Sequence, residues 1–314
     1  MEKIKQHAQR ILLSALLLFT LGFCWFNRST LARIFELSLT DLFLILASYL
    51  MFYLLAAAMA CELLKKRGKH APLWQMVVIN SHSSLLGYVT VLRIGYYTGK
   101  AFLYQKLYQV PITISVGMMA LLSLLVIFTT TLLGVFLGIW AAFVADVTIP
   151  LLYWTLLLAS LIFCITLLGA IYGLALSKRM PQRLKTWLTS LHSVFVETDY
   201  REIGYIMTLA ALSMPFQVLA FSVLFETFNL NLPLLYVAFL AIFSSLSLIV
   251  SLTPANLGVK EFIIWLLVSH LHISAADMIS VMLIDRIVQI LLVVGISLLG
   301  HRGLREEKTK FRPT

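Results

Sequence analysis

Four ionisable residues near the end of the chain lie within otherwise apolar sequence. Lys260 and Glu261 follow a long uncharged stretch, and Asp285 and Arg286 lie inside the next hydrophobic run. A charged group at membrane depth costs roughly 2.5–3.5 kcal/mol on insertion scales, so such groups usually pair with one another or line a polar pathway. The chemistry that these residues suit is the binding of a polar or ionic group inside a membrane, and they are the first candidates for a site.

The backbone just before Lys260 is predicted to be broken. Pro254 cannot donate a hydrogen bond, and Asn256 and Gly258 tolerate turn conformations. We therefore expect one helix to end before Pro254 and another to begin by Val259. Irregular backbone at membrane depth persists only where protein buries it or water reaches it, so Asn256 and Gly258 join the candidate binding residues.

Two pairings between these charges are expected. Glu261 and Arg286 either shape a polar cavity for a lipid headgroup or form a structural salt bridge between two helices, and the two interpretations are compatible. Asp285 points to a different helix face from its neighbour Arg286, and we expect it to pair with Lys260. The alternative for Lys260 is contact with an anionic headgroup.

The composition indicates a polytopic membrane protein along its whole length. Hydrophobic residues make up 61% of the 314 positions and charged residues only 12%, against about 25% charged residues in soluble domains. The longest polar interval, residues 177–202, has room for a loop with a surface helix but not for a nucleotide-binding or catalytic domain. The net charge of +10 therefore indicates topology and contact with anionic lipid, and not nucleic-acid binding.

Hydropathy predicts an all-α helical bundle in a single integral membrane domain, residues 1–314. We expect about eight transmembrane helices and one re-entrant segment, residues 73–92, which is interrupted by polar residues. A full crossing is the alternative for that segment. The predicted spans are residues 11–26, 41–64, 111–137, 149–176, 203–225, 232–252, 256–273 and 277–300.

The distribution of lysine and arginine favours re-entry. With residues 73–92 returning to the side from which they enter, both termini are cytoplasmic and 20 basic residues lie on that side, against 2 outside and 2 embedded. A full crossing would move the basic loop after residue 177 outside, against the positive-inside rule. We therefore expect a multi-pass protein of the cell membrane.

Cysteine labelling checks this topology. A cysteine introduced within residues 27–36 should react with a membrane-impermeant thiol reagent applied from outside, because only two basic residues lie on that side. A cysteine within residues 178–185 should stay unlabelled. Outside labelling of the second position would contradict both the eight-span topology and the re-entrant segment.

A short sequence similarity between the two halves of the chain suggests an inverted repeat. Residues 92–97, which contain Arg93 and Gly95, resemble residues 255–260, which contain Gly258 and Lys260. Paired Gly- or Pro-interrupted segments in the two halves of a transporter point to a central binding site. Arg93 therefore joins the candidate residues, although six positions with one shared glycine can also match by chance.

The order of motifs near the C-terminus resembles the membrane region of lysylphosphatidylglycerol synthases and their stand-alone relatives. That order is a proline, a Gly-Val-basic-Glu turn, a gap of small residues and an arginine in the last helix. In this chain it reads Pro254, Gly258-Val259-Lys260-Glu261, Ser274-Ala275-Ala276 and Arg286.

A second element of the same family has a counterpart in the first half. Residues 95–103, with Lys100 followed by Ala101, resemble the family's "Gly-acid, Arg-Ala, Leu-Leu" element, but Tyr96 or Tyr97 stands where the family has an acid. The resemblance implies a multi-spanning protein that moves or handles polar or glycan-linked lipids, with Lys100 among its binding residues. The soluble aminoacyl-transferring domain of the larger synthases is not expected here.

Three functions fit the sequence. The leading hypothesis is a flippase-like lipid transporter of the cytoplasmic membrane. Its partners would be membrane lipids, either anionic or lipid-linked glycans. It would need no cofactor, metal or nucleic acid, and self-association into a homo-oligomer stays open. The alternatives are a membrane-embedded transferase that uses a lipid-linked donor and a non-transporting accessory subunit. The only close acid clusters that a transferase could use are Glu197, Asp199 and Glu202, and the pair Glu306 and Glu307. We expect a transporter and not an enzyme.

Overall fold

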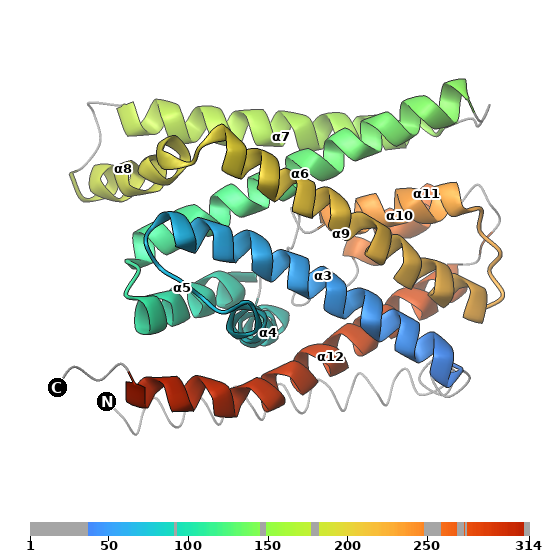
Figure 1. Ribbon diagram of the computed structural model, residues 1–314. Helices are drawn as coiled ribbons and strands as arrows, with labels where there is room; N and C mark the ends of the chain where they lie inside the picture. The colour runs from blue at the N-terminus through green and yellow to red at the C-terminus, as the bar shows by residue number, and fades with distance from the viewer. Residues whose placement is uncertain are drawn as a thin grey trace.

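The computed structural model describes residues 37–90, 93–144, 149–176, 182–247, 259–268, 273 and 275–310. These residues form helices, with no strand among them (Figure 1). The predicted all-α polytopic bundle is confirmed. The helices are α3 (Leu39–Lys66), α4 (Leu73–Val89), α5 (Ile94–Tyr108), α6 (Ile112–Phe143), α7 (Leu151–Leu176), α8 (Gln182–Glu197), α9 (Tyr200–Thr227), α10 (Leu234–Leu246), α11 (Val259–Val268) and α12 (Ala275–Lys310).

Five of the described helices are long and apolar enough to cross a membrane, judged by length and composition alone. They are Leu39–Lys66, Ile112–Phe143, Leu151–Ile171, Tyr200–Thr227 and Asp277–Gly300, and each overlaps a predicted span. Helices α10 and α11, with 13 and 10 residues, are shorter than the roughly 20 residues that a crossing needs. The predicted spans 232–252 and 256–273 continue into residues outside the described part of the chain, as does all of span 11–26, so these stay predictions.

Helix starts follow local sequence signals. The Ser38 side chain caps α3 by accepting a hydrogen bond from the Asp41 backbone N–H (3.0 Å). Helix α9 begins with a capping box, in which Asp199 and Glu202 satisfy each other's backbone N–H groups. A proline stands directly before α4, α6 and α10, where its fixed φ suits a helix start.

Helices α4 and α5 form a tight hairpin. Helix α4 coincides with most of the predicted re-entrant segment, and α5 packs back along it. Arg93, just before α5, adopts a left-handed backbone conformation (φ 52°) that reverses the chain. Gly95 permits the close approach: a Cβ there would lie 2.5 Å from the Leu86 carbonyl oxygen. The segment predicted to re-enter is thus the first arm of a hairpin whose second arm is α5.

Adding a methyl group at Gly95 should loosen this hairpin. Gly95→Ala would collide with backbone atoms of α4 that cannot rotate away, and overpacking of this kind typically costs about 1–3 kcal/mol. Gly204→Ala in α9 is the matched control, since a Cβ there meets nothing within 4 Å and alanine is favoured over glycine in a helix. Thermal unfolding in detergent should show a lower melting temperature for the first variant alone. Equal melting temperatures would mean that the hairpin is not tightly packed at Gly95.

The second half of the chain repeats the first in the opposite direction. The starts of α3 and α9, and those of α4 and α10, are each 161 residues apart. Helices α3 and α9 are both 28 residues long and pack along each other. They are antiparallel, because Lys66 at the end of α3 contacts Asp199 at the start of α9 (2.5 Å). This is the arrangement of an inverted repeat.

Each half also packs on the last helix of the other half. Helix α4 contacts α12, and its counterpart α10 contacts α6. In Figure 1, α4 and α5 lie toward the end of the bundle where α12 terminates, whereas α10 and α11 lie toward the opposite end. The two halves are therefore interlocked, and the short helices of each half lie at opposite ends of the bundle.

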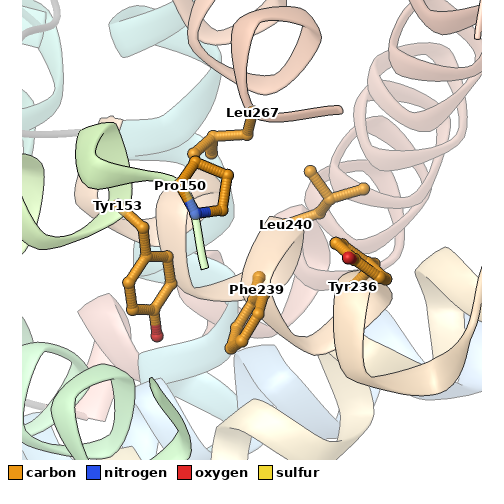
Figure 2. A pocket seen from close by; sticks show the side chains of 6 residues that line it. All are labelled: Pro150, Tyr153, Tyr236, Phe239, Leu240 and Leu267. Carbon is orange, nitrogen blue, oxygen red and sulfur yellow. The ribbon is translucent and has the colours of Figure 1, made fainter. Parts of the chain in front are cut away.

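Aromatic side chains pack α10 against α7. The Tyr153 ring lies 4.6 Å from the Phe239 ring and 5.1 Å from the Phe243 ring, and its hydroxyl donates to the Gly134 carbonyl (2.5 Å). Figure 2 shows the small pocket beside this cluster, lined by Pro150, Tyr153, Tyr236, Phe239, Leu240 and Leu267. The pocket's lining carries no charge, so the pocket is not a candidate for headgroup binding. The aromatic side chains beside it fix the position of α10.

Candidate functional site

Asp285 is the centre of a buried hydrogen-bond network. Its side chain on α12 is fully buried (0% exposed). Lys260 Nζ lies 2.8 Å from one carboxylate oxygen, Gln289 Nε2 donates to both oxygens at 3.0 and 3.1 Å, and the Tyr49 hydroxyl donates to the other. Donors from α3, α11 and α12 thus converge on one carboxylate. The predicted pairing of Lys260 with Asp285 is confirmed.

The position of Lys260 explains why it needs this partner. Lys260 is the second residue of α11, and the N-terminus of a helix favours negative charge over positive. It is also buried, at 8% exposure. The Asp285 carboxylate compensates both the ammonium group and the positive end of the helix, and the Phe221 ring of α9 adds a cation–π contact at 5.2 Å.

The other predicted members of this group are only partly placed. Arg286 is buried on α12, next to Asp285. Glu261 follows Lys260 in α11, but its side chain is outside the described part of the structure, as are Asn256 and Gly258 as whole residues. The pairing of Glu261 with Arg286 therefore stays a prediction.

The two candidates of the first half meet on one tyrosine. Lys100 in α5 is 3% exposed, and its Nζ donates to the Tyr96 hydroxyl (3.3 Å). The same Nζ lies 5.4 Å from the centroid of the Tyr96 ring and 5.7 Å from that of Tyr104. The Arg93 guanidinium lies 5.2 Å from the Tyr96 centroid. Structure thus brings Arg93 and Lys100 together around an aromatic ring.

Tyrosines lie between this pair and the Asp285 network. Tyr88 at the end of α4 hydrogen-bonds to Tyr53 of α3. Tyr88 also lies within electrostatic range of Arg93, Asp285 and Arg286. Polar groups therefore extend from the first hairpin toward the C-terminal network through the interior of the bundle.

Sequence reasoning missed four of these polar residues. Gln289 stands four positions after Asp285, so helical i, i+4 spacing could have indicated it. Tyr49, Tyr53 and Tyr88 lie in ordinary apolar or mixed helices, and Tyr49 is 236 residues from its partner Asp285. No local signal marks them, because only the contacts of α3 with α12 and α4 bring them into the site.

The acid cluster after α8 has structural partners. Asp199 and Glu202 contact Lys66 at 2.5 and 3.6 Å, and Glu197 lies 3.8 Å from Arg67. These ion pairs join the end of α3 to the start of α9. Arg201 lies over the Tyr200 ring (5.8 Å). Across the residues that the structure describes, no group of three His, Cys, Asp or Glu side chains could hold a metal ion.

The described histidine of the first hairpin has an ordinary contact. His82 Nδ1 lies 2.9 Å from the Val78 carbonyl one turn earlier in α4. His270 and His272 lie outside the described residues.

The helical bundle and its buried charges define a multi-pass membrane protein with polar groups at membrane depth. Residues 9–297 match the family described as the lysylphosphatidylglycerol synthase TM region. The chain therefore belongs to this family, as the C-terminal motifs suggested, and the family suggests a membrane protein that handles lipids. Neither a curated protein nor a solved structure matches the chain.

Proposed function

We propose that this protein moves the polar or glycan-linked headgroup of a membrane lipid across the cytoplasmic membrane. The observation that carries the proposal is the buried Lys260–Asp285 pair, which contacts side chains of α3 and α9 and belongs in part to α12, three helices that are apolar enough to span a membrane. A buried ion pair is seldom more stable than a well-packed apolar replacement. Its presence at membrane depth is thus better explained by a polar pathway than by stability.

The arrangement of the hairpins supports a transport route. Short helices at opposite ends of an inverted repeat are how many transporters bring binding groups to the middle of the membrane. Here α5 contributes Arg93 and Lys100, and α11 contributes Lys260. A headgroup that leaves one set of groups could pass to the other, while its hydrocarbon tails stay in lipid.

An apolar groove suits the hydrocarbon part of such a lipid. A groove of about 250 Å³ lies between α7 and the α10–α11 pair. Apart from two serines, its lining is apolar: Leu156, Ala159, Ser160, Phe163, Phe243, Leu246, Ser247 and Ile263. Apolar lining favours a lipid chain over a charged headgroup.

The proposed orientation places both termini in the cytoplasm. The basic residues 65–69, helix α8 and the C-terminal end of α12 all lie toward one end of the bundle in Figure 1. Basic segments favour the cytoplasmic side of a membrane. The same segments would contact anionic lipid of the inner leaflet.

Reconstituted vesicles separate transport from transfer chemistry. Vesicles would carry a trace of phosphatidylglycerol with a fluorescent group on its tail, and an impermeant reductant would report which leaflet holds it. Glu197→Gln together with Asp199→Asn should leave lipid crossing largely intact, because both acids are largely exposed, at 60% and 63%, in their ion pairs with Arg67 and Lys66, and exposed carboxylates of this kind contribute about 0–1 kcal/mol. A covalent lipid product that the wild type forms and this variant does not would favour the transferase alternative.

A further inference from the structure

Lys100 lies in α5, the second helix of the α4–α5 pair, and Lys260 lies in α11, the second helix of the α10–α11 pair. The two lysines differ in how their positive charge is compensated. They stand in similar local sequence, Lys100-Ala101-Phe102-Leu103 and Lys260-Glu261-Phe262-Ile263. Lys260 has the Asp285 carboxylate at 2.8 Å. Among the described residues, no acid forms a salt bridge with Lys100, whose contacts are a tyrosine hydroxyl and two tyrosine rings.

A second cation increases the imbalance in the first hairpin. Arg93 lies over the same Tyr96 ring as Lys100, and within the described part of the chain it too forms no salt bridge with an acid. Cation–π contacts offset only part of the cost of burying a charge. Lys100 is buried and Arg93 is half-buried, so the two cations that share this ring leave positive charge that an anion would neutralise.

The local backbone suits the same ligand. Arg93 and Lys100 flank the N-terminal turns of α5, and the start of a helix attracts anions through its dipole and its free N–H groups. Arg93 also holds a left-handed conformation (φ 52°), which is unfavourable for a residue with a side chain and recurs at ligand-binding positions. The backbone strain at Arg93 and the positive end of the α5 dipole thus lie near the uncompensated positive charge.

We propose that Arg93 and Lys100 bind the phosphate of an anionic lipid headgroup. The phosphate would supply the negative counter-charge that Asp285 supplies to Lys260. This inference rests on the proposed function and names the substrate class as phosphate-bearing lipids. Arginine would supply paired N–H donors to the phosphate oxygens, and Lys100 a point charge. The Tyr96 ring would hold both cations in place while the site is empty.

Lipid-dependent stability of the full-length protein in detergent tests the site. Phosphatidylglycerol should raise the melting temperature of the wild type more than zwitterionic phosphatidylcholine does. Lys100→Gln and Arg93→Gln should each weaken phosphatidylglycerol binding about tenfold, since each removes one charge-assisted contact. Lys106→Gln is the matched control: Lys106 belongs to the same helix and lies over the Phe102 ring (5.5 Å), but it is exposed, so its loss should change binding little.

An internal counter-charge provides an independent variant. Tyr96→Glu places a carboxylate four residues before Lys100, the favourable order for a helical ion pair. The variant should bind phosphatidylglycerol as weakly as Lys100→Gln while melting no lower than wild type without lipid. If Lys100→Gln does not fold, this variant still decides the question.

Three outcomes would overturn the inference. The phosphatidylglycerol shift could survive in Lys100→Gln and Tyr96→Glu, or Lys106→Gln could lose it equally, which would indicate surface attraction only. Inorganic phosphate alone could reproduce the shift, which would assign the site to a soluble anion. Binding is measured without crossing between leaflets, so a wild type that binds but does not move lipid would contradict the proposed function and leave this inference standing.

Discussion

Asp285→Asn is expected to lower the free energy of unfolding by about 3–5 kcal/mol, because it leaves Lys260 buried without a counter-charge. Lys260→Met should cost a similar amount, since it leaves a fully buried carboxylate whose remaining donors among the described residues are Tyr49 and Gln289. The double variant should cost much less than the sum of the two, because neither charge is then left alone. Chemical or thermal unfolding in detergent measures all three.

An exposed pair of the same chemistry is the control for this cycle. Lys65 and Glu62 on α3 are 3.6 Å apart, with side chains 63% and 27% exposed. Lys65→Met and Glu62→Gln should each change stability by less than about 1 kcal/mol. Strict additivity at Lys260 and Asp285 would show that the two groups do not interact in the folded protein.

The long helices are predictable from the sequence because hydropathy over some twenty residues needs no tertiary information. The residues at which these helices end are less predictable. Helix α12 continues to Lys310, ten residues beyond the predicted end at residue 300, because lysine, arginine and glutamate are good helix formers in water. Helix α6 likewise runs to Phe143, past the predicted end at residue 137.

The second arm of the first hairpin has no clear signal in the sequence. Helix α5 mixes Lys100, Gln105 and Lys106 with tyrosines and apolar residues, so neither hydropathy nor amphipathic periodicity marks it. It forms because Gly95 lets it pack against α4. The inverted repeat is also only weakly visible in the sequence. Six similar residues in the two halves suggest it, whereas the equal spacing of the helices and the interlocked packing of the halves are seen only in the structure.

Some contacts of the candidate site can likewise be predicted from the sequence, and others cannot. The pairing of Lys260 with Asp285 follows from the rule that buried charges pair with one another, because four embedded charges, two of each sign, allow few pairings. The roles of Tyr49 and Tyr88 do not follow, because a tyrosine in an apolar helix is common and its partners come from distant helices. The contact of Lys100 with Tyr96 joins residues four positions apart in α5, so helical spacing could have indicated it, whereas the place of Arg93 beside the same ring depends on the left-handed conformation just before the helix.

Transport should be lost in the double variant that lacks this ion pair, even though its fold survives. Lys260→Met with Asp285→Asn removes the Lys260–Asp285 pair from the interior of the bundle, and a headgroup that reaches this point would then be buried without these two charged partners. Burying an unpaired polar group costs roughly 2–7 kcal/mol. Because 1.4 kcal/mol corresponds to a factor of ten, lipid crossing should slow by at least about tenfold. This result would separate a functional network from a salt bridge that only joins two helices.

The rate of lipid crossing in reconstituted vesicles, compared between wild type and this double variant, tests the central claim most directly. Both proteins would first be shown to be folded by their melting temperatures and inserted in equal amounts. We predict that wild-type vesicles exchange labelled phosphatidylglycerol between leaflets faster than protein-free vesicles, and that the double variant returns the rate to the protein-free level. A double variant that moves lipid as fast as the wild type, or a wild type no faster than protein-free vesicles, would contradict the assignment of the buried network to lipid transport.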